Sequence, residues 1–356
     1  MNIEQTITHI LSNAKDSLLQ LTVIEMGIKP VLSQEDNQWS LDLCAGFACD
    51  LLQETLVPVI QTAISTALPN IKVTITLSQF IKAHATQLAG KGLRGVKNTI
   101  AIASGKGGVG KSTVTVNLAT ALAKMGARVG ILDADIYGPS IPLMLGGTAE
   151  VQIKGEHYLP IEAHGVHAMS IGYLMQEESA LIWRGPMLAK SLIQMIDITY
   201  WDDLDYLLID LPPGTGDIQL SLVQKIPLTA AIIVTTPQTV ATLDAQKALN
   251  MFDKTGINVL GIIENMSVHT CSHCGHQDSL FGTGGAQKLC ETHHCQLLGQ
   301  LPLDARITTH CDNGTPTATG TDELAMPFIL AALHTSIELG KRPLNYADKF
   351  PPIVVQ

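Results

Sequence analysis

One short run of glycine and lysine residues has the composition and spacing of a phosphate-binding loop. It matches the pattern G-x-x-x-x-G-K-[ST], follows an apolar run typical of a strand, and precedes helical sequence. Glycines let backbone N–H groups surround phosphates, and the dipole of the following helix adds positive potential. We expect Lys111 to reach the β- and γ-phosphates of a nucleotide and Ser112 to coordinate Mg²⁺. The expected nucleotide-binding loop comprises Gly105, Lys106, Gly107, Gly108, Val109, Gly110, Lys111 and Ser112.

The second position of this loop carries an additional cation, Lys106. It resembles the signature lysine of the deviant Walker A class, which includes MinD, ParA and the nitrogenase iron proteins. The resemblance implies that Lys106 crosses a dimer interface to the partner's nucleotide and is catalytic. There it would act like an arginine finger, an effect worth about 10³–10⁵ in rate. The alternative is a solvated loop lysine.

Carboxylates end two of the apolar runs. Asp210 follows Leu207–Ile209, a Walker B pattern, and we expect it to hold Mg²⁺ through water. Asp133 and Asp135 end another run, and two residues apart on an extended chain they point to the same side. We expect Asp135 to position the attacking water and Asp133 to lie near the metal. The alternative for each carboxylate is a cap on the following element.

Two more segments complete the expected nucleotide site. Pro212–Gly216 directly follows the Walker B carboxylate and is predicted to be a switch that senses the γ-phosphate. Asn265 follows the apolar run 259–263 and resembles the adenine-contacting asparagine of the deviant Walker A class. The alternative for Asn265 is a helix cap.

A second candidate site is a C-x-x-C pair, Cys271 and Cys274, just past the same apolar run. Two thiolates chelate a soft metal, but Cys₄ sites for zinc or iron–sulfur clusters need four ligands. Three histidines lie close to the pair in sequence: His269, His273 and His276.

The other cysteines do not supply the missing ligands. Cys290 and Cys295 are five residues apart in helical sequence and are expected to project about 140° apart, so they are poorly placed to hold one ion. Cys311 stands alone. Three interpretations remain open: thiolates of two subunits meeting across a symmetric interface, a zinc site completed by histidines within one chain, and a redox disulfide.

The elements that must position these residues alternate in type. From Thr99 onward, short apolar runs are separated by helical stretches, which predicts a mostly parallel sheet with helices on both faces. The expected fold class is α/β, a P-loop NTPase preceded by a small α+β domain. The expected strands of the larger domain are residues 99–103, 128–132, 206–209, 230–235, 259–263 and 296–300.

The small N-terminal domain is expected over residues 1–90. Apolar residues predict a helical stripe over residues 3–21, and Pro58 either kinks a second helix at residues 51–68 or marks its first turn. Alternating residues predict half-buried strands at 39–43 and 71–78. The remaining expected divisions are a linker at 91–98, an ATPase domain at 99–340 and a C-terminal tail at 341–356.

Composition excludes several classes of protein. The 356 residues are 46% hydrophobic and carry a net charge of −10, which argues against disorder and against a broadly basic nucleic-acid-binding or membrane-binding surface. No apolar run is long enough to span a membrane, and the first residues lack a secretory signal pattern. Seven cysteines in such a chain favour reduced thiols and a cytoplasmic location.

Several segments together resemble the Mrp/ApbC iron–sulfur carrier proteins. The resemblance runs from about Leu93 to the C-terminus and is specific, because unrelated motifs occur in the right order. The N-terminal domain lacks the Asp-Pro-Glu motif and the Cys-Pro pair that many members carry. The matching segments are Leu93–Asn98, Asp133–Ser140, Asp210–Asp217, Glu264–Ser267 with the C-x-x-C pair, and Phe281–Gly285.

The resemblance implies a homodimeric ATPase that binds a [4Fe–4S] cluster, received from a donor, and passes it to apo iron–sulfur proteins. Cys271 and Cys274 of both subunits would bridge the cluster, and Lys106, Lys111, Ser112, Asp210 and Asp135 would bind and hydrolyse ATP with Mg²⁺. We expect ATP turnover to control loading or release. The alternatives are a structural zinc at the C-x-x-C pair and a MinD/ParA-like positioning ATPase.

Overall fold

The computed structural model describes residues 3–35, 38–147, 150–174, 185–271 and 273–345, without the side chains of residues 185–189. The chain divides into two compact units. The first comprises Met1–Lys82 with Ser336–Lys341, and the second comprises Ala83–Thr335 with Arg342–Gln356. Of the expected tail at 341–356, residues 346–356 lie outside the described part.

This division lies earlier in the chain than the linker expected at 91–98. His84 already belongs to the second unit, because its backbone N–H donates to Asn98 Oδ1 at 3.1 Å. Strand β4 (Val96–Ala103) then begins inside the expected linker. Lys97 Nζ, which looked like a linker cation, lies 2.8 Å from Asp205 Oδ1. The glycines and cations of residues 90–97 therefore lie directly before and at the start of β4, and they do not mark the boundary between the two units.

The first unit is a three-stranded sheet with helices, as expected for a small α+β domain. β1 (Lys29–Glu35) runs antiparallel to β2 (Gln38–Ala45), which runs parallel to β3 (Val73–Gln79). The crossover between the parallel strands contains α2 (Leu52–Thr55) and α3 (Val57–Ala67).

The N-terminal helix is shorter than the apolar stripe predicted. α1 (Ile3–Asn13) ends well before Leu21, and Leu18 is 40% exposed. Pro58 lies in the first turn of α3, so it starts this helix rather than kinking one. The alternation that predicts a strand is absent from β1, because nearly all its residues are exposed.

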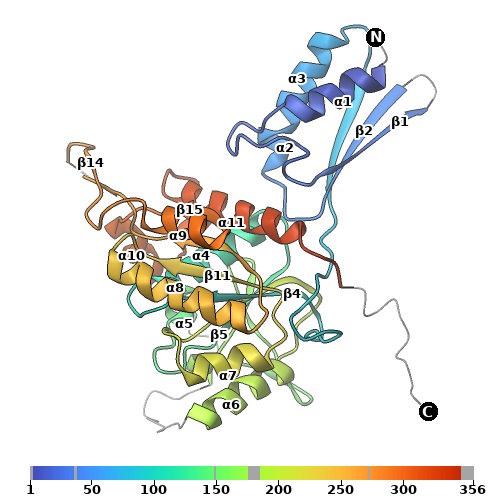
Figure 1. Cartoon of the computed structure of the whole chain (residues 1–356). Coiled ribbons are helices and arrows are strands. Elements are labelled where there is room, and N and C mark those ends of the chain that lie inside the picture. Colours follow the sequence, from blue (N-terminus) through green and yellow to red (C-terminus); the bar gives the residue numbers. More distant parts are fainter. Residues whose placement is uncertain (1–2, 36–37, 148–149, 175–184, 272, 346–356) are drawn as a thin grey trace. The chain divides into compact units, whose positions relative to one another are not determined.

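The second unit contains an eight-stranded sheet (Figure 1). All its pairs are parallel except β8 with β9 at one edge. The parallel sheet agrees with the predicted fold class, whereas the pattern of apolar runs missed β9 and the edge strand β8. In spatial order the strands are β15 (Gln296–Gln300), β12 (Val259–Glu264), β11 (Ala230–Thr235), β4, β10 (Leu204–Asp210), β5 (Val129–Asp133), β9 (Val166–Ser170) and β8 (Ile161–Ala163).

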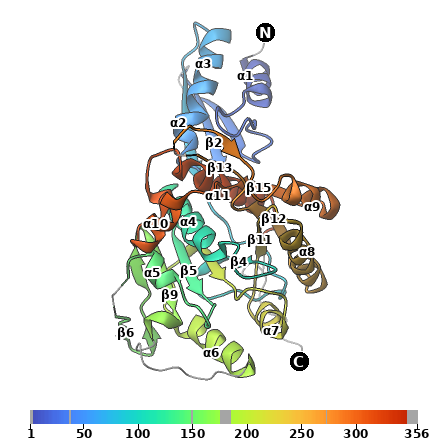
Figure 2. The ribbon, with the colours of Figure 1, turned by 90° about the vertical axis from the view of Figure 1, so that its left-hand side faces the viewer.

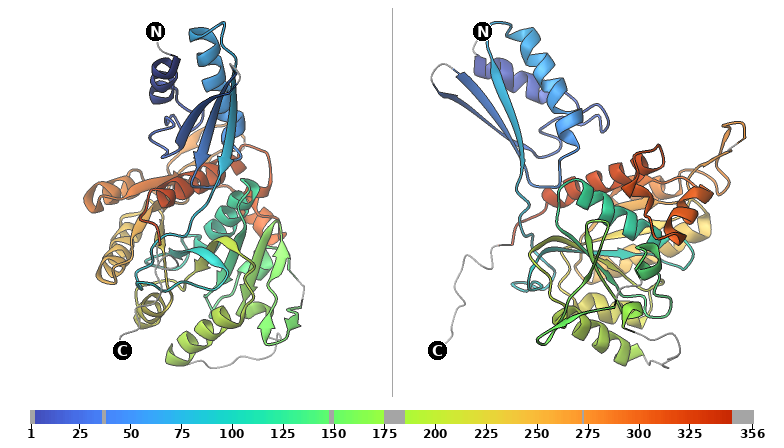
Figure 3. Two further views of the ribbon diagram at one scale, coloured as in Figure 1. Left: turned by 90° about the vertical axis from the view of Figure 1, so that its right-hand side faces the viewer. Right: turned by 180° about the vertical axis from the view of Figure 1, so that it is seen from behind.

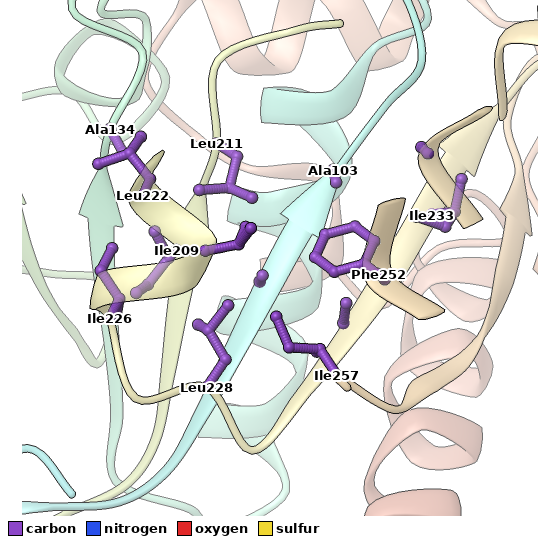
Figure 4. Close-up of a cluster of buried hydrophobic side chains, with 14 of the residues drawn as sticks. Ala103, Ala134, Ile209, Leu211, Leu222, Ile226, Leu228, Ile233, Phe252 and Ile257 are labelled. Carbon is purple, nitrogen blue, oxygen red and sulfur yellow. The ribbon is translucent and has the colours of Figure 1, made fainter. Parts of the chain in front are cut away.

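Helices cover both faces of this sheet, as the uninterrupted apolar strands predicted (Figures 2 and 3). One face buries a cluster that includes Ile209, Ile233 and Phe252 (Figure 4). The helices contributing to this cluster are α6 (Gly185–Ile198), α7 (Asp217–Lys225), α8 (Thr239–Lys254) and α9 (Gly285–His293). The opposite side carries α4 (Lys111–Lys124), α5 (Ile141–Met144) and α10 (Ala305–Asp312).

The remaining elements are short or lie at the end of the chain. α11 (Ala325–Gly340) packs on β15, where a Cβ at Gly299 would lie 2.8 Å from Ala331 Cβ. Two small ribbons pair β6 (Ile153–Lys154) with β7 (His157–Tyr158) and β13 (His269–Thr270) with β14 (Gln277–Asp278). No helix in the described part of the chain is long and apolar enough to cross a bilayer.

Candidate nucleotide and cluster sites

The expected phosphate-binding loop, Gly105–Ser112, joins the carboxyl end of β4 to the amino end of α4. Gly110 caps the helix with a φ of 80°, and a Cβ there would lie 2.3 Å from Asn265 Nδ2, so the backbone and the space both require glycine. The loop lines a cavity of about 210 Å³ together with Asp135 and Pro213. The unbonded N–H groups that begin a helix favour an anion at this position.

Asp210 is the carboxylate on which this loop converges. Lys111 Nζ lies 2.8 Å from Asp210 Oδ2, and Ser112 Oγ donates to the same oxygen at 2.6 Å. Thr115 Oγ1, almost one turn further along α4, donates to Asp210 Oδ1 at 2.7 Å. Thr115 was missed from the sequence, although its position three residues after Ser112 puts it on the same helix face. The structure therefore brings the loop and the Walker B carboxylate together.

Asp133 is a second buried carboxylate beside the first, because β5 and β10 pair Asp133 with Asp210. Its Oδ1 accepts from the Asp135 N–H at 3.1 Å, and its Oδ2 accepts from Ser170 Oγ at 3.0 Å and from the Ile141 N–H at 3.3 Å. Burial, and then the neighbouring Asp210, raise the pKa of Asp133 to about 7. Two carboxylates beside one lysine favour a further cation, and hard oxygen ligands fit Mg²⁺.

Asp135 lies beyond the end of β5, and its carboxyl interacts with the same two charged groups as that of Asp133, namely Lys111 and Asp210. Asp135 lines the phosphate cavity and also a neighbouring cavity of about 730 Å³. Burial raises its pKa, and Lys111 opposes that shift.

The predicted switch segment lies against the phosphate-binding loop. The Gly214 N–H donates to the Ser104 carbonyl at 3.0 Å, and Gly214 has a φ of 102°, which favours glycine. Pro213 lines both cavities. Lys106 lines the phosphate cavity and forms no ion pair with any residue that the structure describes. Its ammonium group is therefore not committed to another side chain of the described chain.

Asn265 contacts the phosphate-binding loop from the end of β12, which lies two strands away from β4 in the sheet. It follows β12, and its side-chain Nδ2 donates to the Val109 carbonyl at 2.9 Å. The side chain is 6% exposed, and the backbone N–H donates to the Thr235 carbonyl at 2.8 Å. The structure thus places Asn265 as a positioning residue for the loop, and the expected adenine contact stays a prediction.

Cys271 and Cys274 lie in the turn of the β13–β14 hairpin, which projects from the second unit (Figures 1 and 3). The Cys271 N–H donates to the His276 carbonyl at 2.9 Å, and the Gly275 N–H donates to the Cys271 carbonyl at 2.9 Å. Cys271 is half-buried and Cys274 is exposed. Backbone N–H groups of Cys274 and His273 lower the pKa of Cys271, which favours the thiolate that binds metal.

No third ligand joins these two thiols in the described part of the chain. Groups of three or more His, Cys, Asp or Glu side chains placed to hold one metal ion are absent there. His269 lies near the pair in sequence, but its Nδ1 lies 3.1 Å from the Leu303 carbonyl. The described residues therefore offer two thiols at this turn and no third ligand beside them.

Comparison with known proteins identifies the family of the chain. Residues 95–337 match the ParA family model, described as NUBPL iron-transfer P-loop NTPase. A protein of Escherichia coli named iron-sulfur cluster carrier protein is 59% identical over 228 residues, which span 64% of this chain and 62% of that protein's length. A protein of the same name from Synechocystis is 41% identical over 339 residues, 92% of this chain and 95% of that protein.

A solved structure shares the fold of the second unit. A nucleotide-binding protein from Archaeoglobus fulgidus, determined in complex with ADP and with cobalt, is 37% identical and aligns with a TM-score of 0.57. The alignment covers 66% of this chain and 93% of that one. These similarities confirm the family resemblance drawn from the sequence motifs. The chain belongs to the ParA family of iron-transfer P-loop NTPases.

Proposed function

We propose that this protein is an iron–sulfur cluster carrier that binds a [4Fe–4S] cluster between two subunits and transfers it to apoproteins. The observation that carries the proposal is the half-buried Cys271 with the exposed Cys274, and no further ligand beside them in the described chain. A cubane cluster takes four thiolates. Two such hairpins facing each other in a homodimer supply that number.

In this proposal, ATP binding and hydrolysis at the nucleotide site control the loading or release of the cluster. Lys111 exchanges its ion pair with Asp210 for the phosphates, whose charge attracts the ammonium group more strongly. Ser112 and Asp210, with Asp133 beside Asp210, would hold Mg²⁺, which would supply positive charge to the phosphates. Asp135 orients the attacking water, and Lys106 reaches the partner's nucleotide.

The cysteine side chains also bear on where the carrier works. None of the seven cysteines forms a disulfide. Free thiols in this number fit a reducing compartment, and we place the protein in the cytoplasm. A cluster donor and apo iron–sulfur proteins are then its partners.

Anaerobic reconstitution with iron and sulfide tests the proposal. The protein should take up a cluster with broad visible absorption, contain about four irons for every two chains, and run as a dimer. The variant C271A/C274A should fold and take up none. The control C44A/C295A removes two other half-buried thiols and should keep the cluster. A colourless protein that holds zinc tightly, or a monomer with a full cluster, would overturn the proposal.

A further inference from the structure

A helix end brings together two cysteines that the sequence separates. α9 ends at His293, and His294 adopts a left-handed conformation with a φ of 53°. The Cys295 N–H then donates to the Cys290 carbonyl at 3.1 Å. The His294 N–H also donates to the Cys290 carbonyl, so the chain folds back and brings Cys295 next to the last turn of the helix. Because Cys295 lies outside the helix, the expectation that the two thiols project apart is wrong.

The two thiols differ in their surroundings. Cys290 is 4% exposed, whereas Cys295 is half-buried. The two thiols interact with each other, and burial raises the pKa of Cys290. Cys295 is the more accessible member of the pair, so it is the thiol that a disulfide from solution reaches first.

We propose that Cys290 and Cys295 are a redox-reactive pair that low-molecular-weight disulfides such as oxidised glutathione convert into an internal disulfide. The Cys295 thiolate attacks one sulfur of the glutathione disulfide and releases a glutathione thiolate. Cys290 then loses its proton and attacks the Cys295 sulfur, releasing the second thiolate. Two protein thiols are oxidised and one glutathione disulfide is reduced to two thiols.

The pair lies outside the β13–β14 hairpin, so oxidation there is a separate modification of the chain. Cys290 lies in the last turns of α9, and Cys295 directly precedes β15. Both elements are also tied by Glu264, whose Oε2 accepts from the Ala286 N–H at 3.0 Å and whose Oε1 accepts from Gln300 Nε2 at 2.8 Å. A disulfide would add a covalent link to this junction.

Tryptic peptide mapping of the full-length protein tests the proposal. Protein is equilibrated anaerobically with oxidised and reduced glutathione, alkylated with N-ethylmaleimide, and digested without reduction. Each cysteine pair falls in its own peptide, so the pairs report separately. The peptides are 16–72 for Cys44 and Cys49, 255–288 for Cys271 and Cys274, and 289–306 for Cys290 and Cys295.

The expected result is a peptide 289–306 that lacks both alkyl groups and is lighter by two hydrogens. Cys44 and Cys49 have the same spacing without the helix-end turn, and they should need a glutathione disulfide-to-thiol ratio at least about tenfold higher. C290S should instead trap glutathione on Cys295, and C295S should prevent both products. A peptide 289–306 that stays fully alkylated while 255–288 oxidises, or equal oxidation of the Cys44 pair, would overturn the proposal.

Discussion

Charge balance organises the nucleotide site at the residue scale. Among the described residues, Lys111 is the cation that pairs with the buried carboxylate of Asp210, and Asp133 lies beside that carboxylate with a raised pKa. A buried carboxylate without its own counter-ion is held partly protonated near neutral pH. The two neighbouring carboxylates therefore favour an additional cation in the site, and a Mg²⁺ ion bound with the nucleotide would be that cation.

The raised pKa of Asp133 makes stability depend on pH. Its pKa is about 7 in the folded chain against 3.8 as the ordinary value, so between these values the folded chain binds more protons than the unfolded chain. Stability therefore falls as the pH rises through this window, by up to about 1.4 kcal/mol per pH unit. Asp133→Asn cannot titrate, and its urea midpoint should vary less between about pH 4 and pH 7.

The matched control is Asp202→Asn, which changes an exposed carboxylate next to the same sheet. It should keep the pH dependence of the unmodified protein. Asp133→Asn also loses an acceptor for backbone and hydroxyl donors, so a uniform loss of about 1–3 kcal/mol is expected at every pH. An unchanged slope in Asp133→Asn would show that this carboxyl does not titrate in the window.

Lys106 is expected to act on hydrolysis rather than on binding. Its side chain lines the phosphate cavity without an ion pair in the described chain. Lys106→Ala should reduce the ATPase rate by about 10³, the lower limit for a cation inserted in trans, while the dissociation constant for ATP changes little. Lys225→Ala, an exposed lysine at the end of α7, is the control. Equal losses in both variants would reject the assigned role.

At the scale of elements, the proposed cluster site is a turn rather than a helix or a strand. The β13–β14 hairpin positions Cys271 and Cys274 through backbone hydrogen bonds, and its tip requires Gly275 with a φ of 71°. Such a turn presents backbone N–H groups to a thiolate without needing a core around it. The proposed cluster binding would therefore depend on the conformation of a few residues.

Gly275→Ala tests this dependence. A left-handed conformation costs an alanine about 1–2 kcal/mol, so the turn should open and cluster uptake should fall by about tenfold, with ATP binding unchanged. Gly155→Ala is the matched control, because Gly155 has a φ of 64° in the β6–β7 ribbon and open space around it. Reconstitution titrations measure the cluster, and nucleotide titrations measure ATP. Loss of cluster in both variants would point to general destabilisation.

The two sites must communicate across the whole molecule if ATP controls the cargo. Asn265 bonds the phosphate-binding loop, and the chain reaches Cys271 only a few residues later. A short rigid connection of this kind lets movement of the loop reach the hairpin. A coupling of about 1–3 kcal/mol, or about 5–150-fold in affinity, is the usual range for allosteric proteins.

Because coupling between two binding sites is reciprocal, the coupling of ATP and cluster can be tested from either site. The factor by which bound ATP changes cluster affinity must equal the factor by which the cluster changes ATP affinity. Both are measured by titration, using a non-hydrolysable ATP analogue and a Lys111→Ala control that should show no coupling. Identical nucleotide affinities for the cluster-loaded and cluster-free protein would refute the control of cargo by ATP.

The local chemistry was readable before any fold was known. Residue types at fixed spacing were enough to select Gly105–Ser112, Asp210 and the C-x-x-C pair as candidate sites. The apolar runs predicted the parallel sheet that carries them. Such patterns survive in a sequence because phosphates, metals and buried strands each demand particular residues at particular separations. The family followed from several such patterns in one order.

Contacts between distant segments were decided only by the tertiary structure. Thr115 reaches Asp210, Asn265 holds Val109, and Asp133 becomes a buried acid because two non-consecutive strands pair in register. The meeting of Cys290 with Cys295 depended on where one helix ends, and a left-handed histidine rather than a glycine marks that end. Periodicity describes a single element, whereas pairing, register and helix ends are set by what the rest of the chain packs against them.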